Sequence, residues 1–345
     1  MNKRLISILQ FVVFFGLGVF LVWWSIHKMD KKDWADCKLA LQSARYFLFI
    51  PVFFILTASH ISRALRWRIL MEPMGYKPGI INTFCAVMVG YLANLALPRL
   101  GEILKCTILG KYEKVPPDKL IGTILIERAT DLISLVIIFI IALISQAHII
   151  GKYARETLTS QLMAGSTKIF TLKLLAAIVI AVVVFALFNF LFKRFAHTSF
   201  IKKIKNIIIG IGIGLSTIKN LKNKWQFILH SIIIWSCYIS GTYIGFYAVE
   251  GTAGLPFVAA FPVLAFASLG MILTPGGIGF YPLFIMQVMA LYKIEEGIGF
   301  ANGTLQWLAQ FVIILIMGFL CLLFLPYYNK KLNNEKYPIH TGQDL

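Results

Sequence analysis

Apolar stretches of eighteen or more residues recur along this chain, and they constrain its fold more than any other feature. A helix of that length can cross the hydrocarbon core of a bilayer. Hydrophobic residues occupy 59% of the 345 positions, charged residues only 14%, and the mean hydropathy is +0.79. A soluble domain is typically about 45–50% apolar and about 25% charged. The sequence therefore predicts an all-α polytopic membrane protein whose chemistry lies within the bilayer.

The formal net charge of +18 would suggest a nucleic-acid partner in a soluble protein. Here lysine and arginine crowd the ends of apolar stretches, where the positive-inside rule and anionic lipid headgroups favour them. No nucleic-acid partner is expected. The five cysteines are scattered, without a C-x-x-C pair or a histidine at ligand spacing, so the sequence indicates no disulfide, metal site or cofactor.

About six full spans and two interrupted segments are predicted within one transmembrane domain, residues 1–345. In chain order its parts are a first span at 5–26, repeat one at 46–145, a linking span at 170–192, a basic amphipathic cytoplasmic segment at 193–224, repeat two at 225–327 and a cytoplasmic tail at 328–345.

Each repeat is predicted to hold an interrupted pair of helices between two spans. The pairs are 80–98 with 102–112 and 256–273 with 278–292, flanked by the spans 46–65, 119–145, 225–249 and 303–327. The segment 102–112 is too short to cross a core of about 30 Å. Pro98 interrupts the first pair and Thr274-Pro275-Gly276-Gly277 the second. Each pair is either a re-entrant hairpin or a broken helix.

Counting lysine and arginine predicts the topology, because these residues concentrate in cytoplasmic segments. With both termini cytoplasmic, 22 of them lie inside and 10 outside. The chain is then expected to be a multi-pass protein of the cell membrane, in a bacterium the inner membrane. The first hairpin would enter from the cytoplasm and the second from outside. Such an inverted repeat is typical of transporters, whose site lies where the breaks meet; the alternative is two unrelated kinked helices.

Two groups of charged residues fall within predicted membrane segments, where ionisable residues are usually functional. Pro98 and Gly101 are expected to open the helix at the first break, which places Arg99 and Glu102 at the opening. The alternative for Arg99 is that its side chain extends to the inner membrane surface.

The second group lies one to two turns into the span 119–145. Glu127 and Asp131 are four residues apart and share a helix face, and Arg128 is expected to pair with Asp131. The arginine could contact a lipid phosphate bidentately. Alternatively, the cluster neutralises itself and holds helices together.

The second break carries no charge. Its residues Pro275, Gly276, Gly277 and Gly279 free backbone N–H groups, and the helix that follows offers a positive dipole end to an anion. A flexible kink is the alternative. Arg63, Arg66, Trp67 and Arg68 close an apolar stretch and are expected to anchor it at the cytoplasmic interface.

Several of these motifs occur in an order that resembles a known family. They are Ser62-Arg63-Ala64-Leu65-Arg66-Trp67-Arg68, Gly90-Tyr91-Leu92-Ala93-Asn94, Leu97-Pro98-Arg99-Leu100-Gly101-Glu102, Glu127-Arg128 with Asp131, and Pro275-Gly276-Gly277-Ile278-Gly279. Together they resemble the lysylphosphatidylglycerol synthase transmembrane-region family of flippase-like proteins. The resemblance implies re-entrant helices and movement of a lipid between leaflets, the lipid being an aminoacylated phosphatidylglycerol in some members and a polyprenyl-type or other lipid in others.

Two features depart from that family. Synthase members continue into a soluble aminoacyl-transferase domain, whereas this chain ends eighteen residues after its last predicted span, so lipid synthesis is not expected. The family also often has a glutamate three residues after the last glycine of the P-G-G-I-G motif, where this chain has Pro282.

The sequence thus predicts a lipid translocase rather than an enzyme. The anionic headgroup would pass between the hairpin tips, with Arg99 and Arg128 as phosphate contacts and Glu102, Glu127 and Asp131 orienting them or coupling a proton. Two alternatives remain: an intramembrane enzyme that modifies a lipid headgroup, and a non-catalytic partner of a separate lipid-modifying transferase.

Overall fold

The computed structural model describes residues 29–97, 100–163 and 221–336, together with Gly16, Phe20, Trp23, Trp24, His27 and Lys219. The side chains of residues 148–163 and 332–336 are not described. Most of the predicted first span, the linking span 170–192 and nearly all of the basic segment 193–224 lie outside the described residues. In the described part the fold is all-helical and contains no β-strand.

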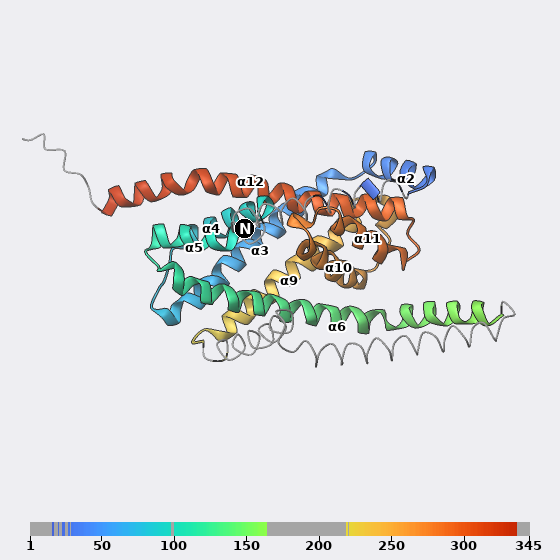
Figure 1. The fold of residues 1–345 in the computed structure, drawn as a ribbon, viewed down its shortest axis with the longest axis horizontal. Helices are drawn as coiled ribbons and strands as arrows, with labels where there is room; N and C mark the ends of the chain where they lie inside the picture. Colours follow the sequence, from blue (N-terminus) through green and yellow to red (C-terminus); the bar gives the residue numbers. More distant parts are fainter. Residues whose placement is uncertain are drawn as a thin grey trace, which may run out of the picture.

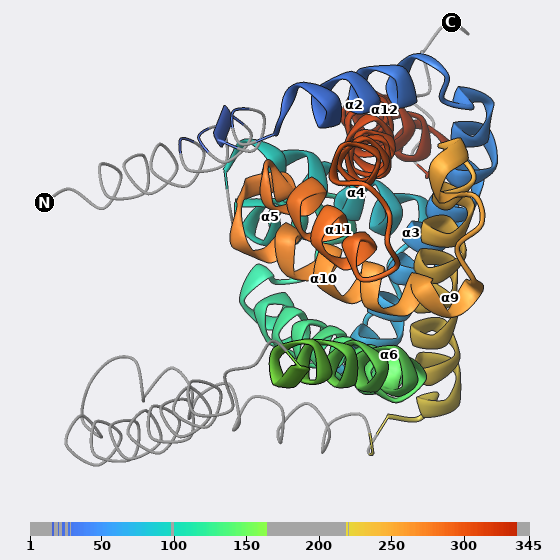
Figure 2. The same ribbon diagram turned by 90° about the vertical axis from the view of Figure 1, so that its right-hand side faces the viewer.

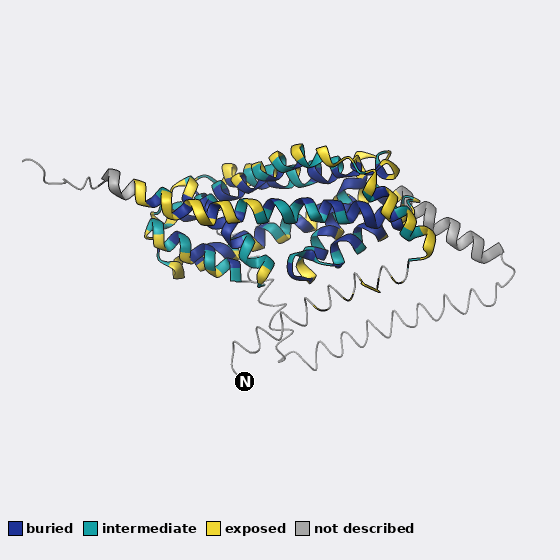
Figure 3. Cartoon of the chain, turned by 90° about the horizontal axis from the view of Figure 1, so that it is seen from above, coloured by how far each residue is buried: buried dark blue, intermediate teal, exposed yellow. Residues whose placement is uncertain are grey.

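Four of the described helices are long and apolar enough to cross a membrane. They are α3 (Phe49–Met71), α6 (Pro117–Met163), α9 (Lys224–Phe246) and α12 (Glu296–Lys336). Large apolar side chains on their outer faces are exposed, for example Ile144 at 73% and Leu323 at 74%, and Figure 3 shows such exposed residues along the outside of the bundle. An apolar surface of this extent indicates contact with lipid.

The helices continue beyond the apolar segments that mark them in the sequence. The predicted spans 119–145 and 303–327 lie inside the longer helices α6 and α12. Hydropathy locates the part of a helix that lies in hydrocarbon, whereas a helix ends only where its hydrogen bonding stops. The predicted tail therefore begins as helix, and α12 even includes Pro326.

Both predicted interruptions are present, and each separates two short helices. The first lies between α4 (Ile80–Ala96) and α5 (Leu100–Glu113), after an extended Leu97. The second lies between α10 (Ala260–Leu273) and α11 (Phe280–Ala290), with a 3₁₀ turn over Pro275–Gly277. Gly276, Gly277 and Gly279 have φ values of 64°, 75° and 81°, a left-handed backbone that glycine adopts without the steric cost of a Cβ.

Helices α4 and α5 pack against each other, and so do α10 and α11. Figure 1 places the α4–α5 pair toward one end of the long helices and the α10–α11 pair toward the other. Figure 2, at right angles, shows these four helices between α12 and α6. Each pair is thus a hairpin within the helix bundle.

The two halves use the same set of helix contacts. Helix α4 packs on α12, and its counterpart α10 packs on α6; at the centre α3 and α9 pack on each other. Figure 1 shows α6 and α12 running in opposite directions. This correspondence supports the predicted repeat, while the orientation of the halves relative to a membrane stays a prediction.

The sequence analysis placed no helix between the predicted first span, which ends at 26, and repeat one, which begins at 46, but most of this stretch is helix α2 (Lys31–Gln42). The Asp30 side chain accepts a hydrogen bond from the backbone N–H of Asp33 at 2.7 Å, and it caps the helix. Helix α2 packs on α12, where Gly297 is required because a Cβ there would overlap the Asp33 carbonyl oxygen. A helix with mixed polarity gives no hydropathy peak, which is why the prediction missed it. Short 3₁₀ turns at Tyr46–Leu48, Glu72–Met74, Glu250–Thr252 and Phe257–Ala259 complete the connections.

Candidate functional site

A cluster of charged side chains is buried among α3, α5, α6 and α9. Helix α3 contributes Arg63 and Arg66, which are three residues apart and therefore on one face. Arg63 is only 6% exposed and Arg66 is fully buried. The expectation that these arginines anchor the helix at the membrane surface is wrong, because both turn inward toward carboxylates of another helix.

Those carboxylates belong to Glu127 and Asp131 on α6, which share a face as predicted. Arg63 Nη1 donates to Asp131 Oδ2 at 2.5 Å, and Arg66 Nη2 donates to Asp131 Oδ1 at 2.6 Å. Glu127 accepts from Lys105 Nζ at 2.6 Å and from Arg63 Nη1 at 3.3 Å. Each buried charge is thus held by at least one group of opposite sign, which a site of low dielectric requires.

Arg128 does not make the predicted pair with Asp131, because Asp131 is already engaged by two arginines of α3. Instead its Nε lies 3.1 Å from Oε1 of Glu102 on α5. No other carboxylate of the described residues forms an ion pair with Arg128. The two side chains are 43% and 30% exposed, so they form the accessible edge of an otherwise buried cluster.

Neutral and aromatic groups complete the surroundings. Trp67 Nε1 donates to Thr123 Oγ1 at 2.8 Å, and Lys105 Nζ lies 4.6 Å from the centre of the Trp67 ring, a cation–π geometry. On α9, Ser231 Oγ accepts from Arg66 Nη1 at 3.1 Å and the Tyr238 hydroxyl accepts from Arg63 Nη2 at 3.4 Å. Four helices therefore converge on the same charges.

The charges do not balance. Four cations, Arg63, Arg66, Lys105 and Arg128, face three carboxylates, Glu102, Glu127 and Asp131, in the ion pairs of the described residues. The formal excess is one positive charge, and the accessible cation is an arginine. A planar guanidinium fits a phosphate or carboxylate bidentately. The arrangement can therefore attract an anionic group to its edge.

This edge lies next to the first break. Glu102 is in the first turn of α5, and the preceding N–H of Gly101 donates to Asn94 Oδ1 at 2.9 Å, across the break. The break itself faces the second one: a Cβ placed on Gly276 would lie 3.0 Å from Leu95 Cδ2. The two hairpin tips therefore touch, as the sequence analysis expected for an inverted repeat.

Comparison with known proteins identifies the family. The model of the lysylphosphatidylglycerol synthase transmembrane region matches residues 7–334, nearly the whole chain. The chain belongs to this family. It is also similar to a UPF0104 membrane protein of Methanocaldococcus jannaschii, with 22% identity over 269 residues, covering 75% of this chain and 79% of that protein. No solved structure matches the chain.

For this member of the lysylphosphatidylglycerol synthase transmembrane-region family, the structure brings together four of the predicted site residues: Glu102, Glu127, Arg128 and Asp131. Arg99 lies outside the described residues. At the second break the Gly276 carbonyl oxygen accepts from Trp307 Nε1 at 2.7 Å, and Pro275, Gly277 and Gly279 are buried. A role in binding for these four break residues stays a prediction.

Three cations of the cluster were absent from the predicted site: Arg63, Arg66 and Lys105. Their spacing contained a usable clue. Arg63 and Arg66 are three residues apart on a helix, so they share a face and can contact the same partner. Lys105 is three residues after Glu102. Intramembrane carboxylates need cationic partners, so two carboxylates on α6 imply cations on neighbouring helices.

Proposed function

We propose that the protein moves a lipid with an anionic headgroup between the leaflets of the membrane. The observation that carries the proposal is the buried ionic cluster with its excess positive charge and its accessible Arg128 beside the break in the first hairpin. Membership of a lipid-related membrane family supports the same conclusion. The apolar chains would remain in lipid while the headgroup crosses through protein.

In this proposal the charged residues have different tasks. Arg128 contacts the phosphate, and Glu102 orients it through Nε, which leaves the two terminal nitrogens of the guanidinium for the ligand. Asp131 and Glu127 hold Arg63, Arg66 and Lys105 in place. The buried cations then supply a fixed positive field without contacting the lipid. Arg99 and the glycines of the second break would meet the headgroup where the tips touch.

The protein would carry the lipid without modifying it. A separate lipid-modifying transferase would make any change to the headgroup. This chain would supply lipid to that transferase or accept lipid from it. That division of tasks fits a cluster in which each carboxylate forms an ion pair with a cation, an arrangement that holds charges in place for binding.

Arg128→Lys tests the proposal, because it keeps the charge but loses the planar fork. In liposomes that contain the purified protein, we expect transfer of a fluorescent phosphatidylglycerol to fall about tenfold, equivalent to about 1.4 kcal/mol. Arg68→Lys is the matched control. Arg68 lies on α3 outside the ion-paired cluster, so this variant should transfer lipid as the unaltered protein does.

Thermal unfolding of each variant separates function from folding. Normal transfer by Arg128→Lys would show that the arginine does not contact the phosphate. A fall in transfer that matches a loss of folded protein would show that the arginine only holds helices together. Equal transfer of a neutral lipid would contradict an anionic substrate.

A further inference from the structure

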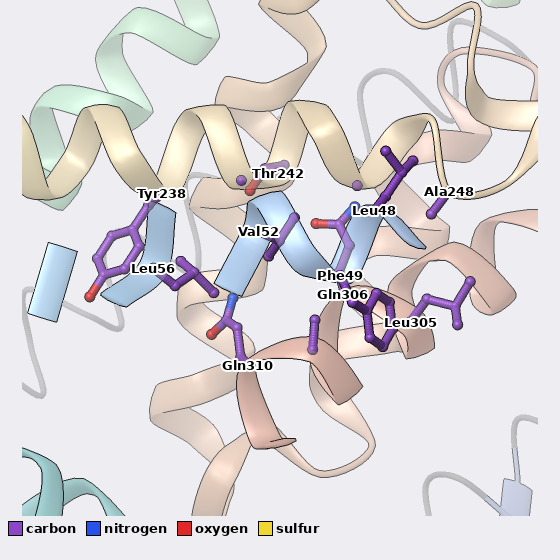
Figure 4. A pocket seen from close by; sticks show the side chains of 13 residues that line it. Leu48, Phe49, Val52, Leu56, Tyr238, Thr242, Ala248, Leu305, Gln306 and Gln310 are labelled. Carbon is purple, nitrogen blue, oxygen red and sulfur yellow. The ribbon is translucent and has the colours of Figure 1, made fainter. Parts of the chain in front are cut away.

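A small cavity lies between α3, α9 and α12, on the opposite side of Tyr238 from the ionic cluster. Its volume is about 30 Å³. Most of its wall is apolar, but Tyr238, Thr242, Gln306 and Gln310 place polar side chains in it, as Figure 4 shows. Its lining extends to Leu48 and Ala248, where α3 begins and α9 ends.

The glutamines belong to a polar row on one face of α12. Asn302, Gln306 and Gln310 are four residues apart, so they lie one above the other on the helix. Asn302 is fully buried and donates to the Gly245 carbonyl oxygen at 2.8 Å. Gln306 donates to Asn302 Oδ1 at 2.7 Å, and Gln310 to the Tyr281 hydroxyl at 3.0 Å. The row joins the cavity to the end of α9.

On the other side the cavity reaches the cluster. Leu56 and Tyr238 line it, and the Tyr238 hydroxyl accepts from Arg63 Nη2. Ser59 lies one turn along α3 between Leu56 and Arg63. Its hydroxyl and Arg63 Nε are both buried without a hydrogen-bond partner among the described residues. Unpaired buried polar groups cost free energy unless a water molecule or another partner satisfies them.

We infer that water fills this cavity and forms a second aqueous approach to the ionic cluster. A water molecule needs about 10–15 Å³ of such space and two to four polar partners, and the cavity provides both. The first approach is at Arg128 and Glu102, beside the first hairpin. The second lies toward Leu48 and Ala248, where α3 begins and α9 ends. Water could thus reach the ionic cluster from two sides, whatever lipid the protein carries.

Silver ions test the inference, because Ag⁺ is small, stays in water and reacts with thiols. In the full-length protein with its five native cysteines replaced by alanine, we introduce Thr242→Cys and, separately, Gly241→Cys. A Cβ at Gly241 meets only Leu56 Cδ2, at an ordinary 3.7 Å, so this variant should fold. We expect both thiols to react at least about tenfold faster than Ile234→Cys, a fully buried control on the same helix that would be exposed only by local opening.

Adding Gln306→Leu and Gln310→Leu should then slow both reactions about tenfold, since an apolar wall keeps a cavity of this size dry. If both thiols are as protected as the control, the cavity is dry and the inference is wrong. If the leucine substitutions leave the rates unchanged, silver arrives by helix opening and the inference is also wrong. Hydroxyl-radical labelling of the unaltered protein gives a check without substitutions: Tyr238 should be oxidised and the fully buried Phe246 should not.

Discussion

Asp131 holds the two arginines of α3, and its removal should strongly destabilise the described cluster. Asp131→Asn keeps the size of the side chain but removes its charge, and it places an NH₂ group, which cannot accept a hydrogen bond, opposite one of the two arginines. Breaking a buried pair from one side typically costs about 3–5 kcal/mol, because the remaining charge stays buried. We expect a marked fall in the thermal unfolding midpoint of the purified protein.

Asp118→Asn makes the same chemical change at an exposed position in the first turn of the same helix. It should cost only about 0.3–1 kcal/mol, from a weaker interaction with the helix dipole. Equal midpoints for the two variants would mean that Asp131 does not hold the arginines of α3 in the folded protein.

At this scale, the sequence identified the carboxylates of the site but not their partners. Spacing along one helix shows which residues share a face, and Glu127 and Asp131 do. It does not show which other helix lies opposite. Arg128 was therefore paired with Asp131, three residues away on the same helix, and Arg63 and Arg66 were assigned to the interface. The packing of α3 against α6 determines which arginines pair with these carboxylates. Spacing along a single helix does not reveal that packing.

At the scale of helices, the close contact between α4 and α5 depends on two glycines. A Cβ at Gly101 would overlap the Gly90 carbonyl oxygen, and one at Gly90 would lie 2.9 Å from the Gly101 carbonyl oxygen. The backbone of one helix thus occupies the space of the other's missing side chain. Gly101 was predicted to open the helix at the break, but in the structure it allows the two helices of the hairpin to pack.

Gly101→Ala should therefore separate the helices of the first hairpin, at a cost of at least about 1–3 kcal/mol. Gly122→Ala is the matched control, because nothing lies within 4 Å of a Cβ there. Alanine in place of glycine within a helix should stabilise the protein by about 0.5–1 kcal/mol. Opposite shifts of the unfolding midpoint are expected. A Gly101→Ala protein as stable as the control would show that the hairpin tolerates separation.

At the scale of the whole molecule, the sequence predicted the number and order of the helices in each half, but not their contacts. Pro98 and the glycines of the second break interrupt apolar segments, so the hairpins could be located from composition alone. The first helix of each hairpin packs on the last long helix of the other half, and this arrangement depends on side-chain fit between distant segments. Gly318, for example, lets α12 approach Leu92 of α4, and no periodicity in either segment predicts that contact.

The same arrangement makes the membrane topology testable at two matched positions. Lys38 on α2 and Lys111 on α5 are both exposed, and each ammonium lies 5.2 Å from the ring centre of a nearby aromatic residue. The charge count places Lys38 outside the cell and Lys111 in the cytoplasm. In protein without native cysteines, an impermeant maleimide should label Lys38→Cys in intact cells, and Lys111→Cys only after permeabilisation. The reverse pattern would invert both hairpins and place the Arg128 edge on the outer side. Labelling of both in intact cells would mean that α5 and α2 lie on one side, which is incompatible with hairpins that enter from opposite faces.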